Sequence, residues 1–298
     1  MSLRDRAVTA AYLGAWKGLG RLPEARARSL FARVGGRAYR RNGRGVQQLR
    51  ANYARLRPDL DAAGLEDLVH DGVQSYLRYW CEAFRLEAWP QDDLVARTRT
   101  VGEERLRAPY ADGRGVVAVL PHQANWDWAG AWACATGMPL MTVAERLRPE
   151  RLYDEFVAYR ASLGMRILPL TGGQQPLPRL EEYLRQGGFV CLLADRDLSR
   201  NAVDVTLCGR AARMPTGPAL LARATGAALV PATLGYVGND LEVTFHEEVG
   251  VGPGPDGVAR AMQQVADAFT TGLHTHPSDW HMMQRVFTED LPAVEGRP

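Results

Sequence analysis

The sequence predicts an α/β protein: a single domain with a mainly parallel central sheet covered by helices on both faces, preceded by an amphipathic helical extension. The chain has 298 residues, 46% of them hydrophobic and 23% charged, which is ordinary globular composition and enough for one large domain. From about residue 115 onward, short apolar runs alternate with stretches of helical periodicity. Such alternation is typical of parallel strands joined by helices. No segment has the composition of a linker, so we expect residues 1–298 to form one domain.

The N-terminal region is strongly basic and has an amphipathic pattern. From Leu3 to Leu19 apolar residues recur at helical spacing, and Tyr12 and Trp16 would suit the headgroup region of a bilayer. Residues 1–57 carry fourteen basic and two acidic residues, a charge of +12, so a net charge of +2 leaves −10 for the rest. We expect residues 1–57 to be a basic helical extension that faces an anionic membrane surface. The alternative is a helix packed on its own domain. Nucleic acid is disfavoured, because no recognised binding motif accompanies the charge.

The remaining elements follow from periodicity. A helix is predicted from Leu65 to Leu86, with an apolar stripe of Val69, Val73, Tyr76, Leu77, Trp80 and Phe84. Strands are predicted at Val116–Leu120, Leu140–Ala144, Ile167–Leu170, Phe189–Ala194, Ala228–Leu234 and Leu241–Phe245. Helices are predicted at 149–164, 177–187, 215–226 and 256–275, with Gly and Pro at the joins.

Several features bear on compartment and cofactors. The four cysteines form no CxxC pair and lie in apolar surroundings, so we interpret them as buried free thiols in a reducing compartment. No run approaches the roughly 20 apolar residues that cross a bilayer, and no signal peptide is recognisable. The sequence therefore predicts a soluble or peripheral protein without a metal ion.

The best candidate for chemistry is His122, which follows the buried strand Val116–Leu120, with Asp127 five residues later. In open α/β sheets ligands bind at the carboxyl ends of strands. An imidazole held by a carboxylate is a general base suited to an alcohol. Five residues correspond to about 140° on a helix, so the two side chains can meet only if His122 lies in the turn. His274 and Asp279 share the spacing but lack the preceding strand.

The HQANWD segment at 122–127 resembles the HxxxxD motif of glycerolipid-type acyltransferases. The chain is more particularly similar to the bacterial lipid A lauroyl/myristoyl acyltransferase family and, within it, to the actinobacterial phosphatidylinositol mannoside acyltransferases. Further blocks carry this resemblance across residues 115–287: VAERL at 143–147, YRASLGMRILPL at 159–170, LLADRDLSR at 192–200, GRAARMPTGPALLARATGAALVPA at 209–232 and HPSDWHMMQRVF at 276–287.

The resemblance implies transfer of a palmitoyl-like chain from an acyl thioester, acyl-CoA or acyl carrier protein, to a mannose hydroxyl of a glycolipid acceptor. In this scheme His122 deprotonates the hydroxyl, Asp127 orients His122, and no enzyme nucleophile or cofactor is needed. The sequence leaves the oxyanion donors open, although backbone amides after Pro121 are reasonable candidates. We expect a catalytic core at 115–287 and a peripheral location on the cytoplasmic face of the membrane.

Six other residues are candidates for substrate binding. Asp195 follows the strand Phe189–Ala194 and could hold sugar hydroxyls, although members of this branch often carry the longer Glu there. Arg196 could pair with a phosphate. Glu145 and Arg160 could line the acceptor site or form a structural ion pair. Arg210 and Arg213 precede a helix start and could meet phosphates of either substrate.

The C-terminal block HPSDWHMM leaves two interpretations open. His281 could be a satisfied core histidine, and Trp280, Met282 and Met283 could be core or acyl-groove lining. Three alternative functions also remain: acylation of another glycolipid such as a lipid A precursor, thioester hydrolysis, and non-catalytic lipid binding. The intact His122–Asp127 pair disfavours the last.

Overall fold

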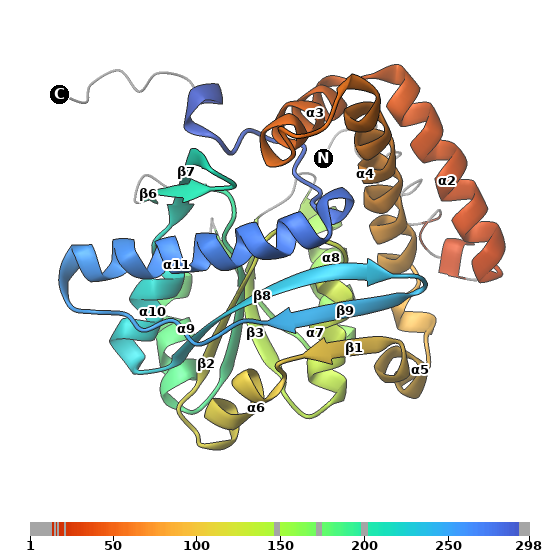
Figure 1. Cartoon of the computed structure of the whole chain (residues 1–298). Coiled ribbons are helices and arrows are strands. Elements are labelled where there is room, and N and C mark those ends of the chain that lie inside the picture. The colour runs from red at the N-terminus through yellow and green to blue at the C-terminus, as the bar shows by residue number, and fades with distance from the viewer. Residues whose placement is uncertain are drawn as a thin grey trace.

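The computed structural model describes residues 14, 16, 18–20, 22–145, 150–170, 175–197 and 202–291. A seven-stranded sheet in the order β1-β9-β8-β2-β5-β3-β4 forms its centre (Figure 1). The strands of this sheet are β1 (Thr98–Val101), β2 (Val116–Leu120), β3 (Leu140–Ala144), β4 (Arg166–Pro169), β5 (Phe189–Leu193), β8 (Ala228–Val237) and β9 (Asp240–Phe245). Strands β8 and β9 pair antiparallel, and the other neighbours in this sheet pair parallel. The predicted fold class, a mainly parallel α/β sheet, is confirmed.

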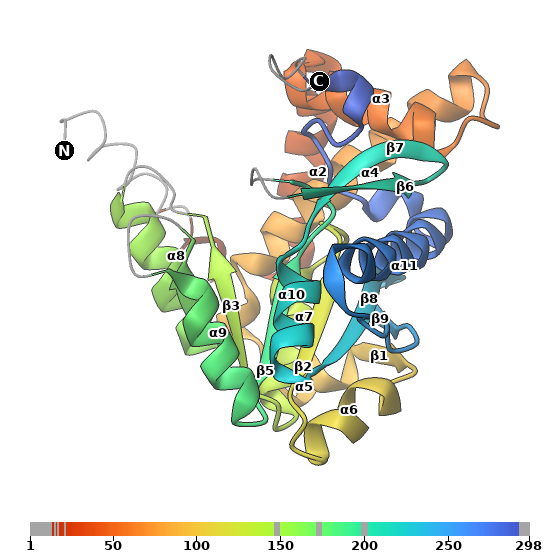
Figure 2. The ribbon, with the colours of Figure 1, turned by 90° about the vertical axis from the view of Figure 1, so that its left-hand side faces the viewer.

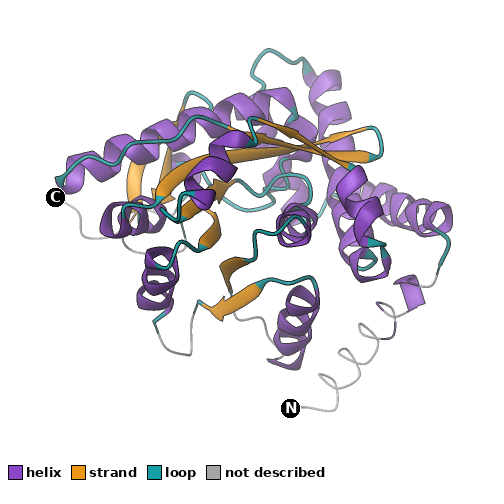
Figure 3. Ribbon diagram, turned by 90° about the horizontal axis from the view of Figure 1, so that it is seen from below, coloured by secondary structure: helices purple, strands orange, loops and turns teal. Residues whose placement is uncertain are grey.

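Helices cover both faces of the sheet (Figure 3). One hydrophobic core contains side chains of α9 (Pro176–Arg185), α10 (Gly217–Thr225) and α11 (Gly254–Thr275). The other contains side chains of α5 (Gln91–Ala96), α6 (Glu104–Ala111), α7 (Trp126–Ala135) and α8 (Glu150–Ser162). Strand β2 serves both cores: Val117 and Val119 face the first, and Val116, Ala118 and Leu120 face the second. This two-sided burial explains why the strand is apolar throughout.

The predicted strands and helices agree with the observed ones to within three residues at either end. Strand β1 and the antiparallel hairpin of β6 (Ala202–Leu207) and β7 (Arg210–Pro215) were not predicted. Strand β1 has the sequence TRTV, and it alternates partly buried with exposed residues. Its apolar signal is therefore too weak to separate it from a loop.

The N-terminal helices lie at the end of the sheet where β2 and β5 finish (Figures 1 and 2). They are α2 (Glu24–Arg41), α3 (Arg44–Leu56) and α4 (Ala62–Ala83). The predicted helix at Leu65–Leu86 corresponds to α4, whose Val69 and Val73 are fully buried. Most of the predicted helix at Leu3–Leu19 lies outside the described residues.

Trp16 corrects one expectation. Its indole is only 8% exposed and packs at 5.0–5.2 Å against the rings of Phe84, Phe156 and Tyr159. The expected place of Trp16 at a membrane headgroup region is therefore wrong, because the ring fills part of the protein's own core. Among the described residues, no helix is both long enough and apolar enough to cross a bilayer.

The sheet opens between β3 and β5. These strands pair from Leu140↔Phe189 to Thr142↔Cys191, after which β3 stays with β4 and β5 stays with β2. Figure 2 shows β3, α8 and α9 on the left of the view, set apart from β5. The opening lies at the carboxyl end of the parallel strands, where α/β proteins bind their ligands.

Candidate active site

His122 and Asp195 are brought together by strand register. Leu120 of β2 lies opposite Leu193 of β5, and the two polar residues each come two positions later. The Asp195 carboxylate accepts two hydrogen bonds from His122, one from the backbone amide at 2.9 Å and one from Nδ1 at 2.6 Å. With Nδ1 donating to a carboxylate, the lone pair of Nε2 is left to accept a proton.

Asp195 is held ionised although it is fully buried. Burial alone would raise the pKa of this carboxyl, but the charge of His122 and three hydrogen bonds outweigh it and lower the pKa below its ordinary value. The third hydrogen bond comes from the buried indole of Trp280, whose Nε1 lies 2.9 Å from Oδ2. A buried carboxylate with this tight set of donors is suited to fixing the imidazole tautomer.

Asp127 does not make the predicted contact with His122. Its carboxylate accepts hydrogen bonds from Arg160 Nε at 2.7 Å and from the Tyr79 hydroxyl at 2.9 Å. The reason is that α7 begins at Trp126, which places Asp127 in the first helical turn, while His122 lies in the preceding loop and already has Asp195 as its partner. Burial would lower the pKa of Arg160, but the neighbouring Asp127 carboxylate outweighs burial and raises this pKa, so the guanidinium is charged. The prediction that Asp127 orients His122 is therefore wrong, and Asp195 makes this contact instead.

The loop that carries His122 is fastened to the C-terminal segment. Gln123 is fully buried; its side chain donates to Gly272 O at 3.1 Å and accepts from Leu234 N at 3.1 Å. Ala124 has φ +46°, a strained value for a residue with a Cβ. His122 O accepts from the amide of His281 at 2.8 Å. These hydrogen bonds hold the His122 imidazole in a defined position.

The candidate oxyanion donors after Pro121 are already occupied. The amide of His122 donates to Asp195, that of Gln123 to Pro121 O and that of Ala124 to Asp279 O. These three amides are therefore used to build the loop and are not free to stabilise an oxyanion, and the groups that would do so stay open.

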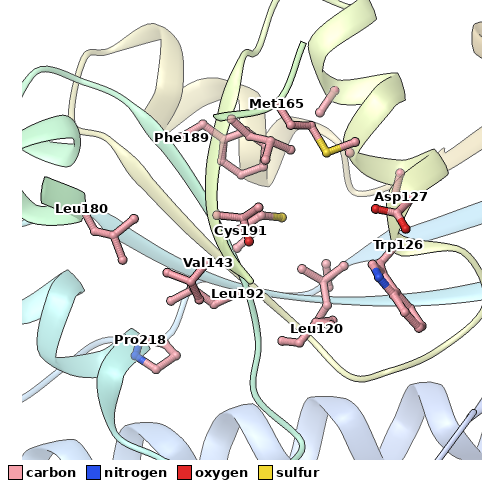
Figure 4. A pocket seen from close by; sticks show the side chains of 18 of the residues that line it. Leu120, Trp126, Asp127, Val143, Met165, Leu180, Phe189, Cys191, Leu192 and Pro218 are labelled. Carbon is pink, nitrogen blue, oxygen red and sulfur yellow. The ribbon is translucent and has the colours of Figure 1, made fainter. Parts of the chain in front are cut away.

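Two cavities meet at His122. The first, of about 540 Å³, is mainly apolar and passes through the opening between β3 and β5. Figure 4 shows Leu120, Met165 and Phe189 around it, with Trp126 and Asp127 on one side and Leu180 and Pro218 on the opposite side. The second, of about 370 Å³, has aromatic walls that include Tyr76, Tyr79, Trp126 and Phe156. The residues that line both cavities include His122, Trp126, Glu145, Arg160 and Arg196.

The other predicted binding residues divide into two groups. Glu145 and Arg196 both line the two cavities and form an ion pair, with Oε2 and Nη2 3.6 Å apart. Arg210 and Arg213 lie on the β6–β7 hairpin, and neither lines the two cavities described above. Arg213 lies 3.4 Å from Asp204 and 3.6 Å from Asp197, and Arg210 is exposed. Their contact with phosphates stays a prediction.

Four residues of the site were missed as functional: Tyr79, Gln123, Trp126 and Trp280. Two of them, Gln123 and Trp126, stand inside the HQANWD segment, and Trp280 stands in the C-terminal block HPSDWHMM, so adjacency to those motifs was an available signal. Tyr79 comes from α4, and its contact with Asp127 spans 48 residues of sequence. No local sequence pattern predicts a contact between residues so far apart in the chain.

A mainly parallel α/β sheet with a carboxylate-held histidine beside an apolar cavity is the arrangement of an enzyme site that takes an apolar substrate. The family model for bacterial lipid A biosynthesis acyltransferases matches residues 2–289, and the chain belongs to this family. It is therefore an O-acyltransferase.

Individual relatives in the family are similar to almost the whole chain. The chain is 42% identical over 283 residues to a phosphatidylinositol mannoside acyltransferase of Mycolicibacterium smegmatis, covering 94% of this chain and 91% of that protein. It is 41% identical over 284 residues to a protein of the same name from Mycobacterium tuberculosis, covering 94% of this chain and 89% of the relative.

Proposed function

We propose that this enzyme transfers a long acyl chain, palmitoyl or similar, from an acyl thioester to a mannose hydroxyl of a phosphatidylinositol mannoside. The observation that carries the proposal is the His122–Asp195 pair at the junction of an apolar and an aromatic cavity. The names of the relatives support a phosphatidylinositol mannoside as the acceptor. Acyl-CoA is the proposed donor, and acyl carrier protein is the alternative.

The proposed reaction is direct transfer. Nε2 of His122 takes the proton of the mannose hydroxyl while its oxygen attacks the thioester carbonyl carbon. The new C–O bond forms, the C–S bond breaks, and the leaving thiolate takes the proton from the imidazolium. Asp195 stabilises the imidazolium and holds its orientation, and base catalysis of this kind contributes roughly 10²–10⁴-fold.

The two cavities suit the two substrates. The apolar cavity has a volume in the range of small-molecule sites and an apolar wall of Leu120, Met165, Phe189 and Leu180, which suits an acyl chain. Aromatic rings and a few charged groups, as in the second cavity, suit a sugar, since rings cover its C–H faces and polar groups take its hydroxyls. Both substrates then meet at His122.

A peripheral position on the cytoplasmic face of the membrane is part of the proposal. Helix α2 exposes Leu30 at 43% and Val34 at 45%, and Arg33 and Arg37 on the same helix are exposed as well. Exposed apolar residues among basic ones favour an anionic lipid surface. Such a location would bring the enzyme to its lipid-linked acceptor.

The test is transfer of labelled palmitate from palmitoyl-CoA to mannosylated phosphatidylinositol. His122→Ala is expected to lose at least about 100-fold in kcat with its fold intact. His70→Ala, which removes an exposed histidine of α4, is the matched control and should equal the wild type. Undiminished transfer by His122→Ala would show that the assigned base is wrong. If the wild type transfers only to a lipid A precursor, or only releases free palmitate, the acceptor assignment is wrong.

A further inference from the structure

His281 is a buried histidine with one nitrogen unused. Its side chain belongs to a residue only 6% exposed, and Nδ1 has no hydrogen-bond partner among the described residues. Buried polar atoms without a partner are rare, because each has lost its hydrogen bonds to water without replacement. The interpretation of His281 as a satisfied core histidine therefore fails, and its free nitrogen needs another explanation.

The neighbours of His281 determine which nitrogen carries the hydrogen. The Ser75 hydroxyl donates to Asp279 Oδ1 at 2.6 Å, so its oxygen is left to accept a hydrogen bond. His281 Nε2 lies 2.9 Å from that oxygen and must be the donor. In a neutral ring Nδ1 then carries a lone pair and can only accept. Burial, together with the charge of His122, lowers the pKa of His281 to about 3, so the ring is neutral at pH 7.

The position of His281 relates it to the acceptor side of the site. It lines the aromatic cavity, and its backbone amide donates to His122 O at 2.8 Å. The ring of Trp126 lies 5.6 Å from that of His122 and 6.4 Å from that of His281, measured between centroids. Trp126 therefore lies close to both imidazoles in the wall of this cavity.

We propose that His281 is an acceptor-binding residue whose Nδ1 accepts a hydrogen bond from a second hydroxyl of the sugar, distinct from the hydroxyl that His122 deprotonates. Ser75 and Asp279 act as positioning residues that hold the ring as an acceptor. The inference rests on the proposed function, because it assumes a sugar in the aromatic cavity. It adds a determinant of acceptor specificity: a sugar that lacks this hydroxyl leaves Nδ1 unsatisfied and is rejected.

Two substitutions separate the two nitrogens. In His281→Gln the side-chain amide can still donate to Ser75 but has no acceptor at the place of Nδ1. In His281→Asn the amide oxygen can occupy that place, while the link to Ser75 is lost. His70→Gln on the exposed surface of α4 is the control.

The experiment measures transfer kinetics with the natural acceptor and with acceptors whose mannose lacks one hydroxyl at a time. One deoxy acceptor is expected to lower kcat/KM of the wild type about tenfold, the worth of one hydrogen bond. His281→Gln is expected to raise KM for the full acceptor about tenfold, to leave KM for the acyl donor unchanged, and to show no further loss with that same deoxy acceptor. His281→Asn should recover part of the discrimination, and thermal unfolding checks that each variant is folded.

The outcomes distinguish the two proposals. If the wild type transfers palmitate and His281→Gln discriminates among deoxy acceptors as the wild type does, the role of His281 is refuted while the proposed function stands. If His281→Gln loses activity equally with every acceptor and donor, the residue is structural and the inference is again refuted. If the wild type acylates no mannoside, both proposals fail together.

Discussion

The two buried carboxylates of this site, Asp195 and Asp127, have different hydrogen-bond partners. Asp195 contacts His122 and Trp280, so its charge acts on the imidazole that we propose as the base. Asp127 contacts Arg160 and Tyr79, so its charge fastens α8 to α7 and α4. Substitution of each by Asn should therefore affect different quantities, although both residues are buried.

Asp195→Asn is expected to lower kcat at least about 100-fold, because the amide no longer stabilises the imidazolium and favours the wrong tautomer. KM for either substrate should change little. Asp127→Asn is expected to leave Arg160 with a buried, uncompensated charge and to destabilise the fold by about 3 kcal/mol. Steady-state kinetics and urea unfolding of both variants check this, and equal kinetic losses with equal stability would contradict the assignment.

The histidines predict a pH dependence of stability. Burial lowers the pKa of His281 to about 3, and burial with the charge of Arg105 lowers that of His246, from ordinary values of 6.5. The unfolded state then binds protons more readily, so this stability is complete above pH 6.5 and is lost as the pH falls toward 3. The lowered pKa of Asp195 acts in the same direction below pH 3.8, whereas burial raises the pKa of Asp279, which acts oppositely.

We expect the free energy of unfolding to fall by about 2 kcal/mol between pH 6.5 and pH 5 through His281 alone. Urea titrations at both values check this. His281→Gln should show a smaller difference than the wild type, and an unchanged difference would mean that His281 is not the group responsible.

At the scale of elements, the opening between β3 and β5 forms the apolar cavity that we propose for the acyl chain. Cys191 belongs to the last register pair before the strands separate, and its side chain lines the apolar cavity. Burial raises the pKa of this thiol to about 12, so it is not a nucleophile at neutral pH. The Cys191 side chain therefore forms part of the wall of the apolar cavity.

Cys191→Phe is expected to fill part of the cavity and to shift donor preference toward shorter acyl chains, with KM for palmitoyl-CoA raised about tenfold by the lost apolar burial. KM for the mannoside acceptor should stay constant. Cys191→Ser, which conserves size, is the control and should retain the wild-type preference. A series of acyl-CoA chain lengths provides the measurement, and an unchanged preference in Cys191→Phe would place the acyl chain elsewhere.

At the scale of the whole molecule, charge is distributed unevenly along the chain. Most basic residues of the segment 1–57 belong to α2 and α3, which stand at the carboxyl end of the sheet (Figure 1). His122 follows the carboxyl end of β2 and therefore lies at the same end. A lipid surface bound by these helices would therefore be on the same side of the molecule as the site. This arrangement suits an acceptor that is itself a lipid.

Binding to vesicles of phosphatidylinositol and phosphatidylcholine should weaken with salt, since it depends on basic residues. Leu30→Ser combined with Val34→Ser is expected to weaken it at least about tenfold, because two apolar anchors are lost. Val101→Ser, at a residue 49% exposed on β1, is the control. Co-sedimentation is the measurement, and equal binding by the double variant would exclude α2 as the contact surface.

Sequence by itself determined the fold class, most strands and helices of the core, and His122 as the base candidate. Strands such as β2 are buried on both faces, and their continuous apolar runs are visible without a structure. The identity of the family also follows from motifs local in sequence. Six of the eight predicted site residues line a cavity or contact His122.

Only the tertiary structure decided which carboxylate serves His122. The five-residue spacing made Asp127 the natural choice, but strand order places β5 beside β2, and their register brings Asp195 to Nδ1. Sheet order and register depend on contacts between residues far apart in the chain, and local periodicity does not contain them. The same holds for His281. Its Nε2 is paired with Ser75, 206 residues away, and this pairing leaves Nδ1 as the free acceptor.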